Sequence, residues 1–225
     1  TIKAVPVTGI DVYAIQKKEL AGAATTGQNF FTYGARVNGA VMNIDWDVEA
    51  ALQSGDSSVA GTTTTKKSAS AIWAIAGYSL PEVAKLRIGA EYDQLSGQDT
   101  STDDKAFDHL FLTKHSTSAQ HSVYGITEIV EGSLGYGLKA FSINASAEPV
   151  EGLKLLAEYW NFSSAEDMAN GKTAIGNEMN LQVWYAVTKS TGVHAYYAAF
   201  TPSSDFAAAK QDPATDLVLQ LQVAF

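Results

Sequence analysis

DLVLQLQVAF, residues 216–225, alternates between two kinds of side chain along its whole length. One face is entirely apolar and consists of Leu217, Leu219, Leu221, Val223 and Phe225. The opposite face mixes polar and small side chains. A period of two residues is typical of a β-strand whose two faces meet different surroundings. Because chain ends usually fray unless something holds them, this stretch predicts a structural strand with one apolar face.

The same alternation recurs in nine other stretches of the chain. It is clearest in IDWDVEAAL (44–52), KLRIGAEYD (85–93), LKLLAEYWN (153–161) and EMNLQVWYAV (178–187). Weaker versions are GIDVYAIQK (9–17), FTYGARVNGAV (31–41), AIWAIAGYSL (71–80), LKAFSINASA (138–147) and GVHAYYAAF (192–200). The sequence therefore predicts about ten strands of about 9–11 residues, the length with which a tilted strand crosses a bilayer. No long stretch carries the 3.6-residue apolar period of an amphipathic helix.

The connections between these stretches alternate between long and short. Residues 54–70, 95–136 and 162–177 form long connections, whereas 42–43 and 148–152 form short ones. Outer-membrane barrels sort their connections in this way, with short periplasmic turns and long extracellular loops. The sequence therefore predicts an all-β, antiparallel transmembrane β-barrel in a bacterial outer membrane, with residues 95–136 as a long extracellular loop.

The composition fits this class and excludes several others. Of 225 residues, 46% are hydrophobic and 17% are charged, which is too apolar for a disordered chain. The net charge of -9 argues against nucleic-acid binding, which needs clustered Lys and Arg. The absence of cysteine excludes disulfides and thiolate metal sites, and we expect no cofactor. No apolar run approaches the roughly 20 residues of a transmembrane helix.

We expect residues 1–225 to form a single barrel domain in which 1–8 are the tail of a preceding strand. The chain starts at Thr1 without a leader, which indicates a processed, trimmed or partial sequence. In a barrel the terminal strand must pair with another strand, because an open edge in lipid leaves backbone groups unsatisfied. The terminal Phe225 also resembles the C-terminal signal that the barrel-assembly machinery recognises.

Several stretches resemble the alginate-export family of bacterial outer-membrane proteins. They are LRIGAEYDQLSGQD (86–99), FDHLFLTKHS (107–116), Tyr124-Gly125 and HAYYAAFTPSSDF (194–206). Two features depart from the family pattern: FLTKH replaces a Pro-Thr-Asn-His-like run, and an extra STSAQHS precedes Tyr124. The resemblance implies a barrel of about eighteen strands. The chain is then either the C-terminal part of such a barrel or a smaller, even-stranded relative, such as a closed barrel of ten strands.

Charged side chains on the polar face are the functional candidates, because a charge facing lipid costs about 2–4 kcal/mol near the midplane. The inward basic residues predicted by alternation are Arg36, Arg87, Lys139 and Lys154. The inward acidic residues are Asp45, Asp47, Glu49, Glu91, Asp93 and Glu158. Rings of charge in a pore select solutes by sign, whereas cross-strand pairs would neutralise the same side chains within the wall. Unless a further part of the barrel supplies positive charge, the excess of acidic positions argues against polyanionic alginate as the solute.

Aromatic side chains on the inward face are a second set of candidates. Trp160, Trp184 and Tyr196 are predicted to point inward, where they either stack on sugar rings or fill the lumen of a small barrel.

The acidic stretch GQDTSTDDKAFD (97–108) is best interpreted as a solvated loop, able to bind cations that bridge lipopolysaccharide phosphates. It contains the weak Ca²⁺ candidates Asp99, Asp103 and Asp104, but lacks the EF-hand spacing. The nearby His109, His115 and His121 are six residues apart and match no standard metal motif.

The pattern as a whole predicts a passive channel for small or anionic solutes, saccharides included. One alternative is a scaffold barrel that sheathes or docks a partner protein. An outer-membrane enzyme is a further alternative, although no Gly-x-Ser-x-Gly motif is present. The expected partners are outer-membrane lipid and lipopolysaccharide, the assembly machinery, and a small solute or polysaccharide.

Overall fold

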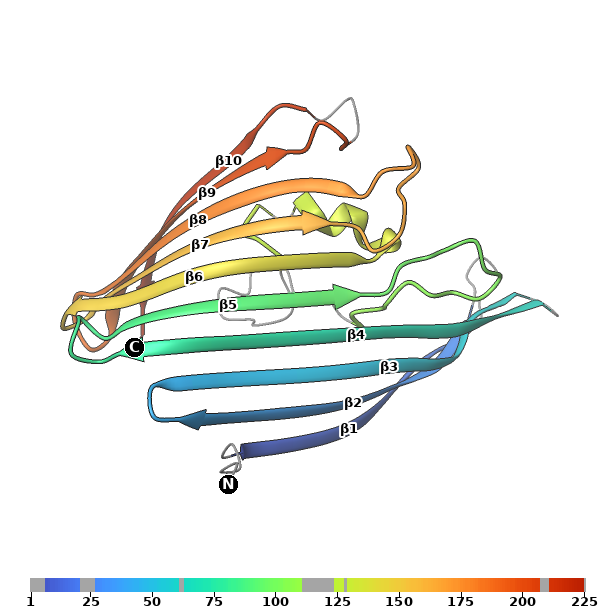
Figure 1. The fold of residues 1–225 in the computed structure, drawn as a ribbon, viewed down its shortest axis with the longest axis horizontal. Helices are drawn as coiled ribbons and strands as arrows, with labels where there is room; N and C mark the ends of the chain where they lie inside the picture. Colours follow the sequence, from blue (N-terminus) through green and yellow to red (C-terminus); the bar gives the residue numbers. More distant parts are fainter. Residues whose placement is uncertain are drawn as a thin grey trace, which may run out of the picture.

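The computed structural model describes residues 7–20, 27–60, 63–110, 124–127, 129–206 and 211–224. Its strands form one antiparallel sheet in which each strand pairs with the next along the chain (Figure 1). The strands are β1 Val7–Glu19, β2 Gly27–Val41, β3 Ile44–Ala60, β4 Thr63–Leu80, β5 Leu86–Leu95, β6 Leu138–Val150, β7 Leu153–Ser163, β8 Ala174–Ala186, β9 Thr191–Pro202 and β10 Ala214–Val223. Each of the ten predicted alternating stretches overlaps one of them along most of its length, which confirms the all-β antiparallel fold.

Helical structure is confined, among the described residues, to the short 3-10 helix η1, Ile129–Tyr136, between β5 and β6. No helix in the described part of the chain is long and apolar enough to span a membrane.

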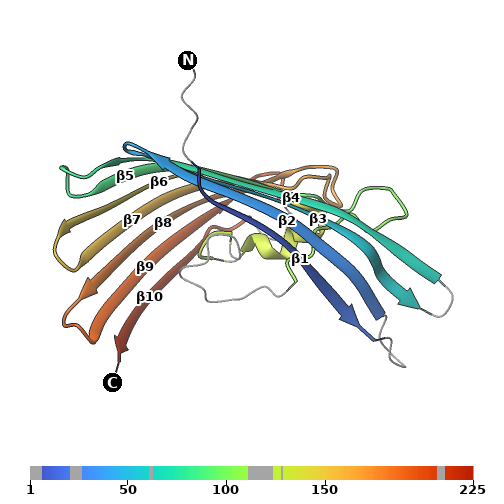
Figure 2. The same ribbon diagram turned by 90° about the horizontal axis from the view of Figure 1, so that it is seen from below.

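The sheet is curved, and η1 lies on its concave side (Figure 2). Its two edge strands are β1 and β10, whose described residues do not pair with each other. The sheet is therefore not closed, and these strands do not form the ten-strand closed barrel that the sequence allowed. Unpaired backbone groups remain along both edges, which is a state that proteins ordinarily cover or pair.

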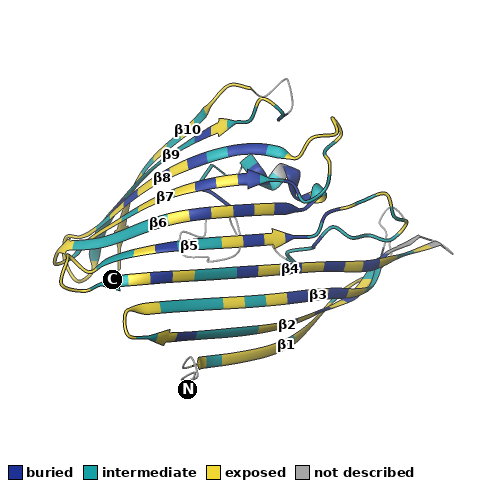
Figure 3. Cartoon of the chain, viewed as in Figure 1, coloured by how far each residue is buried: buried dark blue, intermediate teal, exposed yellow. Residues whose placement is uncertain are grey.

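The convex face of the sheet is apolar and exposed, as the alternation predicted. On β10, Leu217, Leu219 and Leu221 are all at least 66% exposed, and similar side chains continue across β8 and β3. Burial instead follows the concave side of β4 to β8, where exposed and buried residues alternate along each strand (Figure 3). Apolar surface left in water costs about 25 cal/mol per Å². A continuous apolar face of this size therefore requires an apolar environment.

Aromatic side chains on the convex face gather near the two ends of the strands. Tyr92 and Phe141 pair across β5 and β6 close to the long connections. Tyr78 and Tyr185 lie beside the short turns that follow β4 and β8. Two aromatic bands with an aliphatic zone between them are typical of a sheet that spans a bilayer.

Several boundaries differ from those that the sequence predicted; residues 162–163 and 174–177, for example, belong to β7 and β8 and not to a connection. Residues 54–60 and 63–70 belong to strands and not to a loop, because β3 continues to Ala60 and pairs with β4 from Thr63 onward. Their Ser and Thr side chains suit strands, but polar and apolar residues do not alternate there. The sequence therefore shows no period of two in this stretch. With 18 residues, β4 is also longer than expected. β1 begins at Val7, so 7–8 of the predicted tail belong to β1, and 1–6 lie outside the described residues.

Candidate functional site

Ion pairs between strands line the concave face of β2 to β5. Arg36 on β2 donates to Asp47 on β3, with its Nε 2.9 Å from Oδ1. Arg87 on β5 reaches past β4 to Asp45 on β3, where its Nε lies 2.9 Å from Oδ2. The Arg87 side chain passes over Gly77, whose missing Cβ would lie 2.2 Å from Nη2. The glycine thus makes room for a bridge between two strands that are not neighbours.

Two more predicted inward residues lie on the same face. Glu49 accepts a hydrogen bond of 2.5 Å from the hydroxyl of Tyr13 on β1. Lys154 lies near the turn between β6 and β7, with its Nζ 3.7 Å from an oxygen of Glu148. Because both side chains of this last pair are well exposed to solvent, the interaction contributes little to stability.

The predicted inward placement of Lys139 is wrong. Its cross-strand partners are Gln94 and Ser163, and it shares the exposed, convex side of β6 with Phe141 and Ile143. Leu138 and Ala140, which lie beneath the β5–β6 connection, occupy the concave side instead. Because apolar residues occupy both faces here, the alternation does not reveal which of them faces the lumen.

The β5–β6 connection, residues 96–137, is long as predicted, but its described parts fold over the concave face. The segment after β5 runs beside the part of β4 that β5 does not cover. Asp104 donates its backbone N–H to the carbonyl of Lys66 and accepts from the N–H of Ser68, at 2.8 and 2.9 Å. The N–H of Ser96 similarly donates to the carbonyl of Ser70. These bonds extend the sheet ladder into the connection.

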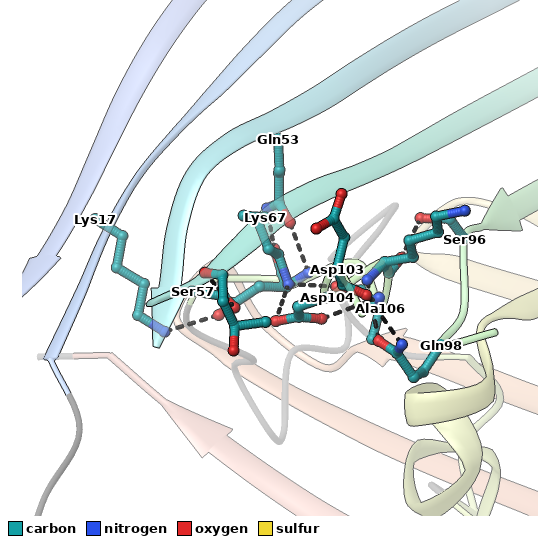
Figure 4. Close-up of polar contacts among 12 residues, drawn as sticks. Lys17, Gln53, Ser57, Lys67, Ser96, Gln98, Asp103, Asp104 and Ala106 are labelled. Carbon is teal, nitrogen blue, oxygen red and sulfur yellow. Dashed lines mark hydrogen bonds and ion pairs between the residues drawn. The ribbon is translucent and has the colours of Figure 1, made fainter. Parts of the chain in front are cut away.

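Two lysines of the sheet anchor this segment (Figure 4). Lys67 on β4, only 5% exposed, donates to Asp104 at 3.1 Å and to the carbonyl of Ala106. Lys17 on β1 donates to Asp108 at 2.8 Å. Burial strengthens such charge-assisted bonds, because the local dielectric constant is low.

An amide and an aromatic ring complete this anchor. Gln53 on β3 both donates to and accepts from the backbone of Asp108, at 2.6 and 2.8 Å. The Nζ atoms of Lys17 and Lys67 lie 5.8 and 5.5 Å from the ring centroid of Phe30 on β2, where cations are attracted by the ring. Side chains of the four strands β1 to β4 thereby all contribute to the anchor of the segment that follows β5.

A carboxylate anchors the second part of the connection. Glu178 on β8, 1% exposed, accepts hydrogen bonds from the N–H groups of Ile126 and Thr127 and from the Thr127 hydroxyl. Gly125 precedes this pair with a φ of +78°, and a Cβ there would lie 2.6 Å from the Glu178 carboxylate. The glycine therefore satisfies both the backbone turn and the close approach.

Aromatic contacts fill the space between the connection and the sheet. Trp73 on β4 donates its indole N–H to the hydroxyl of Tyr124 at 3.0 Å. Phe107 and His109 pack edge to face, and His109 lies against Tyr124 in the same way. Burial lowers the pKa of His109 from 6.5 to about 4, so this ring is neutral at neutral pH.

The remaining predicted inward carboxylates, Glu91, Asp93 and Glu158, lie on the concave side of β5 and β7. No lysine or arginine lies within ion-pair distance of them among the described residues. The described part of the wall thus has one section, on β2 to β5, whose acidic and basic side chains pair, and one section, on β5 to β8, whose acidic side chains have no basic partner.

The predicted inward aromatic residues occur in two stacks. Trp160 is buried beneath the connection and lies parallel to Phe162, with ring centroids 5.6 Å apart. Trp184 on β8 stacks on His194 of β9 at 4.6 Å, and Tyr196 follows. The first stack fills space, whereas the second lies towards the short turns, outside the region that the connection covers.

The weak Ca²⁺ candidates do not converge. Asp99 accepts from Lys105 and Ser101, both at 2.7 Å, and these bonds hold its pKa well below the usual range. Asp104 binds Lys67 instead, and Asp103 accepts at its backbone carbonyl. Within the described ranges, no three acidic or histidine side chains are arranged to hold a metal ion directly. His115, His121 and Phe225 lie outside the described residues.

Sequence reasoning missed the residues that hold the connection: Lys17, Gln53, Lys67, Tyr124 and Glu178. Lys17 and Glu178 continue the inward register of predicted strands, so alternation could have found them. Lys67 lay in a stretch predicted as a loop, so the alternation could not assign its side chain to either face of the sheet. Tyr124 drew attention only through the family resemblance, because nothing local indicates that its ring packs on Trp73.

The fold is similar to that of a solved structure, Pseudomonas aeruginosa OccK5 (OpdH), with a TM-score of 0.54 and 11% sequence identity. The similarity covers 96% of this chain and 58% of that one, so this chain spans less than two thirds of the length of OccK5. No curated protein matches the sequence. The family model described as alginate export matches residues 3–219. Since that match spans nearly the whole sequence, the chain belongs to the alginate export family.

Proposed function

We propose that the chain forms part of the wall of a β-barrel channel in a bacterial outer membrane, through which small polar solutes diffuse passively. One observation carries this proposal: a curved sheet with an apolar, exposed convex face and a polar concave face over which a long connection folds. An apolar outside suits acyl chains, and a polar inside suits a water-filled path. Membership in the alginate export family adds support for transport over catalysis.

Further strands must complete such a barrel. The edges of β1 and β10 are unpaired among the described residues, and the similarity to OccK5 leaves 42% of that chain (100% − 58%) without a counterpart. We propose that additional strands, from the same polypeptide or from a second copy, pair with both edges. Backbone groups left unpaired in lipid would otherwise cost several kcal/mol each, on the order given by amide transfer to hydrocarbon.

The proposed solutes are small and polar, and include saccharides. The Trp184–His194 stack offers aromatic faces on which sugar rings can lie. Anionic solutes, which the sequence also suggested, receive less support, since each described basic side chain on the concave face already has a carboxylate partner. Outer-membrane lipid would contact the convex face, and the assembly machinery would recognise the C-terminal strand.

The test is the electrical conductance of the full-length protein in planar lipid bilayers. A channel gives ohmic steps of conductance. A scaffold that sheathes a partner protein, or an enzyme with a closed barrel, gives none. Folding is checked by the heat-dependent shift in electrophoretic mobility that barrels show in detergent. Absence of steps from folded protein would refute the proposal.

A matched pair of variants tests whether the β5–β6 connection narrows the path. Glu178→Gln weakens the charge-assisted bonds to Ile126 and Thr127, so we expect larger conductance steps or frequent transitions between levels. Glu82→Gln, in the exposed turn between β4 and β5, removes the same charge without touching the connection and serves as the control. Identical traces from both variants would show that the connection does not restrict the current.

A further inference from the structure

Five polar side chains lie on the concave face of β5 to β8. We call Glu91, Asp93, Ser142, Glu158 and Asn180 the acidic cluster. Glu91 is the direct cross-strand neighbour of Ser142, and Glu158 that of Asn180. Asp93 follows Glu91 on the same face of β5. Direct cross-strand neighbours have Cβ atoms about 5 Å apart, so Glu91 lies beside Ser142 and Glu158 beside Asn180, and the side chains of Glu91 and Glu158 are close enough for their charges to interact.

Three members of the acidic cluster are buried without hydrogen-bond partners. Asp93 is 1% exposed, and its carboxylate oxygens make no hydrogen bond of acceptable geometry, although its side chain lies close enough to that of Glu91 to interact with it. Ser142 and Asn180 are fully buried, and neither the hydroxyl nor either amide atom makes a hydrogen bond of acceptable geometry. The amide of Asn180 nevertheless lies close enough to Glu158 to interact with its charge. Because more than about nine in ten buried polar groups are partnered, several such orphans in one place indicate a missing ligand.

The chemistry of the acidic cluster points to a cation. Three carboxyl groups are present, and the guanidinium of Arg87, whose charge interacts with Glu91, is already held by Asp45. The hydroxyl of Ser142 and the amide oxygen of Asn180 add neutral oxygen ligands. Carboxylate, amide and hydroxyl oxygens are the ligands that hard cations such as Ca²⁺ prefer. Since no three acidic groups among the described residues converge tightly, the cation would retain part of its water shell.

We propose that the acidic cluster binds a partly hydrated cation in the wall beneath the β5–β6 connection, and that it gives the channel a preference for cations. This inference rests on the proposed channel function for its second half only. A bound cation would supply the positive charge that this section of the wall lacks, and rings of carboxylates raise the local concentration of cations in a pore. Glu178 is not part of the acidic cluster, because the connection already occupies its carboxylate.

Binding is tested directly with the full-length protein in detergent. Tb³⁺ serves as a luminescent probe that nearby Trp160 and Trp73 can sensitise, and Ca²⁺ is then titrated as the competitor. We expect Asp93→Asn to weaken Ca²⁺ competition about tenfold, because ligand charge tunes calcium affinity. Glu82→Gln, an exposed acid outside the acidic cluster, should leave it unchanged.

A second variant separates ligation from general electrostatics. Ser142→Ala removes an oxygen ligand without changing the charge or breaking a hydrogen bond. We expect a loss of affinity of about threefold, and this variant also covers the case in which Asp93→Asn fails to fold. If neither substitution alters Ca²⁺ competition, the proposal is overturned. A proton shared between Glu91 and Asp93 would then account for the unpartnered oxygens.

Reversal potentials in a KCl gradient test the second half of the inference. We expect a preference for K⁺ over Cl⁻ that falls about twofold or more in Asp93→Asn, since a ring charge sets selectivity by sign. Conductance without cation preference or Ca²⁺ binding would overturn this inference and leave the channel intact. Ca²⁺ binding that Asp93→Asn abolishes, in a protein that passes no current, would support the site and refute the channel.

Discussion

Two sections of the same concave face differ in how their charges are satisfied. In the paired section, on β2 to β5, Arg36 and Arg87 bind Asp47 and Asp45 across the strands. In the acidic section, on β5 to β8, Asp93 is more deeply buried, yet no cation is within ion-pair distance of it among the described residues. Both sections follow the same alternation. The comparison shows that alternation places a charge on a face, whereas the neighbouring strand decides whether that charge is neutralised.

The largest effect is expected from a substitution that breaks the contact between the acidic section and the connection. Gly125→Ala places a Cβ 2.6 Å from the Glu178 carboxylate, which must move. We expect the second part of the connection to be destabilised by about 2–3 kcal/mol, from overpacking and backbone strain together. Hydrogen exchange of residues 124–137, followed by mass spectrometry, measures this directly.

Gly171→Ala is the matched control for that prediction. Its φ of +72° is close to the +78° of Gly125, but no atom lies within 4 Å of its added Cβ. The control therefore reports backbone strain alone, about 1 kcal/mol. Equal effects at both positions would show that the approach of Gly125 to Glu178 does not matter.

The next prediction compares the free energy of unfolding after one carboxylate from each section is replaced. Asp47→Asn leaves Arg36 without its partner and should lower the free energy of unfolding by about 1–2 kcal/mol, a value reduced for partial solvent exposure. Asp93→Asn, measured in the presence of a chelator, removes a buried acidic side chain that has no basic partner among the described residues and should leave stability unchanged or raised. Urea unfolding in lipid vesicles measures both. An equal loss in the two variants would contradict the distinction between the sections.

A smaller effect concerns the anchor between the connection and the paired section. Lys67→Met removes the buried ammonium group that holds Asp104 and Ala106, and should destabilise residues 96–110 by about 1 kcal/mol. Lys66→Met removes a neighbouring lysine that pairs with Asp56 but is 64% exposed in its side chain, so little change is expected. Hydrogen exchange of residues 96–110 compares the two. Similar exchange rates would argue that Lys67 does not anchor the connection.

The smallest expected effect is a loss of stability of the docked connection, and it appears only at acidic pH. The pKa of His109 is about 4 in the docked connection and 6.5 when it is exposed, so the undocked state binds the extra proton more readily. Docking is then fully stable above about pH 6.5 and weakens as the pH falls towards 4. Hydrogen exchange of residues 96–110 at pH 7 and pH 5 should differ, and His109→Gln should reduce that difference. A pH dependence unchanged by the substitution would assign it to other groups.

Much of the fold could be predicted from the sequence because bilayer and lumen impose opposite demands on alternate residues. The period of two found all ten strands and placed Arg36, Asp47 and Asp93 on the concave face. It failed at Lys139, because the connection buries apolar side chains on the concave side of β6. It failed again at residues 54–70, where β3 and β4 are polar on both faces and only their pairing reveals the strands.

The sequence by itself determined the strands and the chemistry of the two faces, since local periodicity encodes both, and the short connections imposed the antiparallel order. Tertiary structure decided which charges are paired and which remain buried without a partner. The path of Arg87 across Gly77, the inward fold of the β5–β6 connection, and the acidic cluster beneath it each depend on residues that lie far apart in the chain. No local pattern records such distances, because register and curvature bring these residues together only once the sheet has formed.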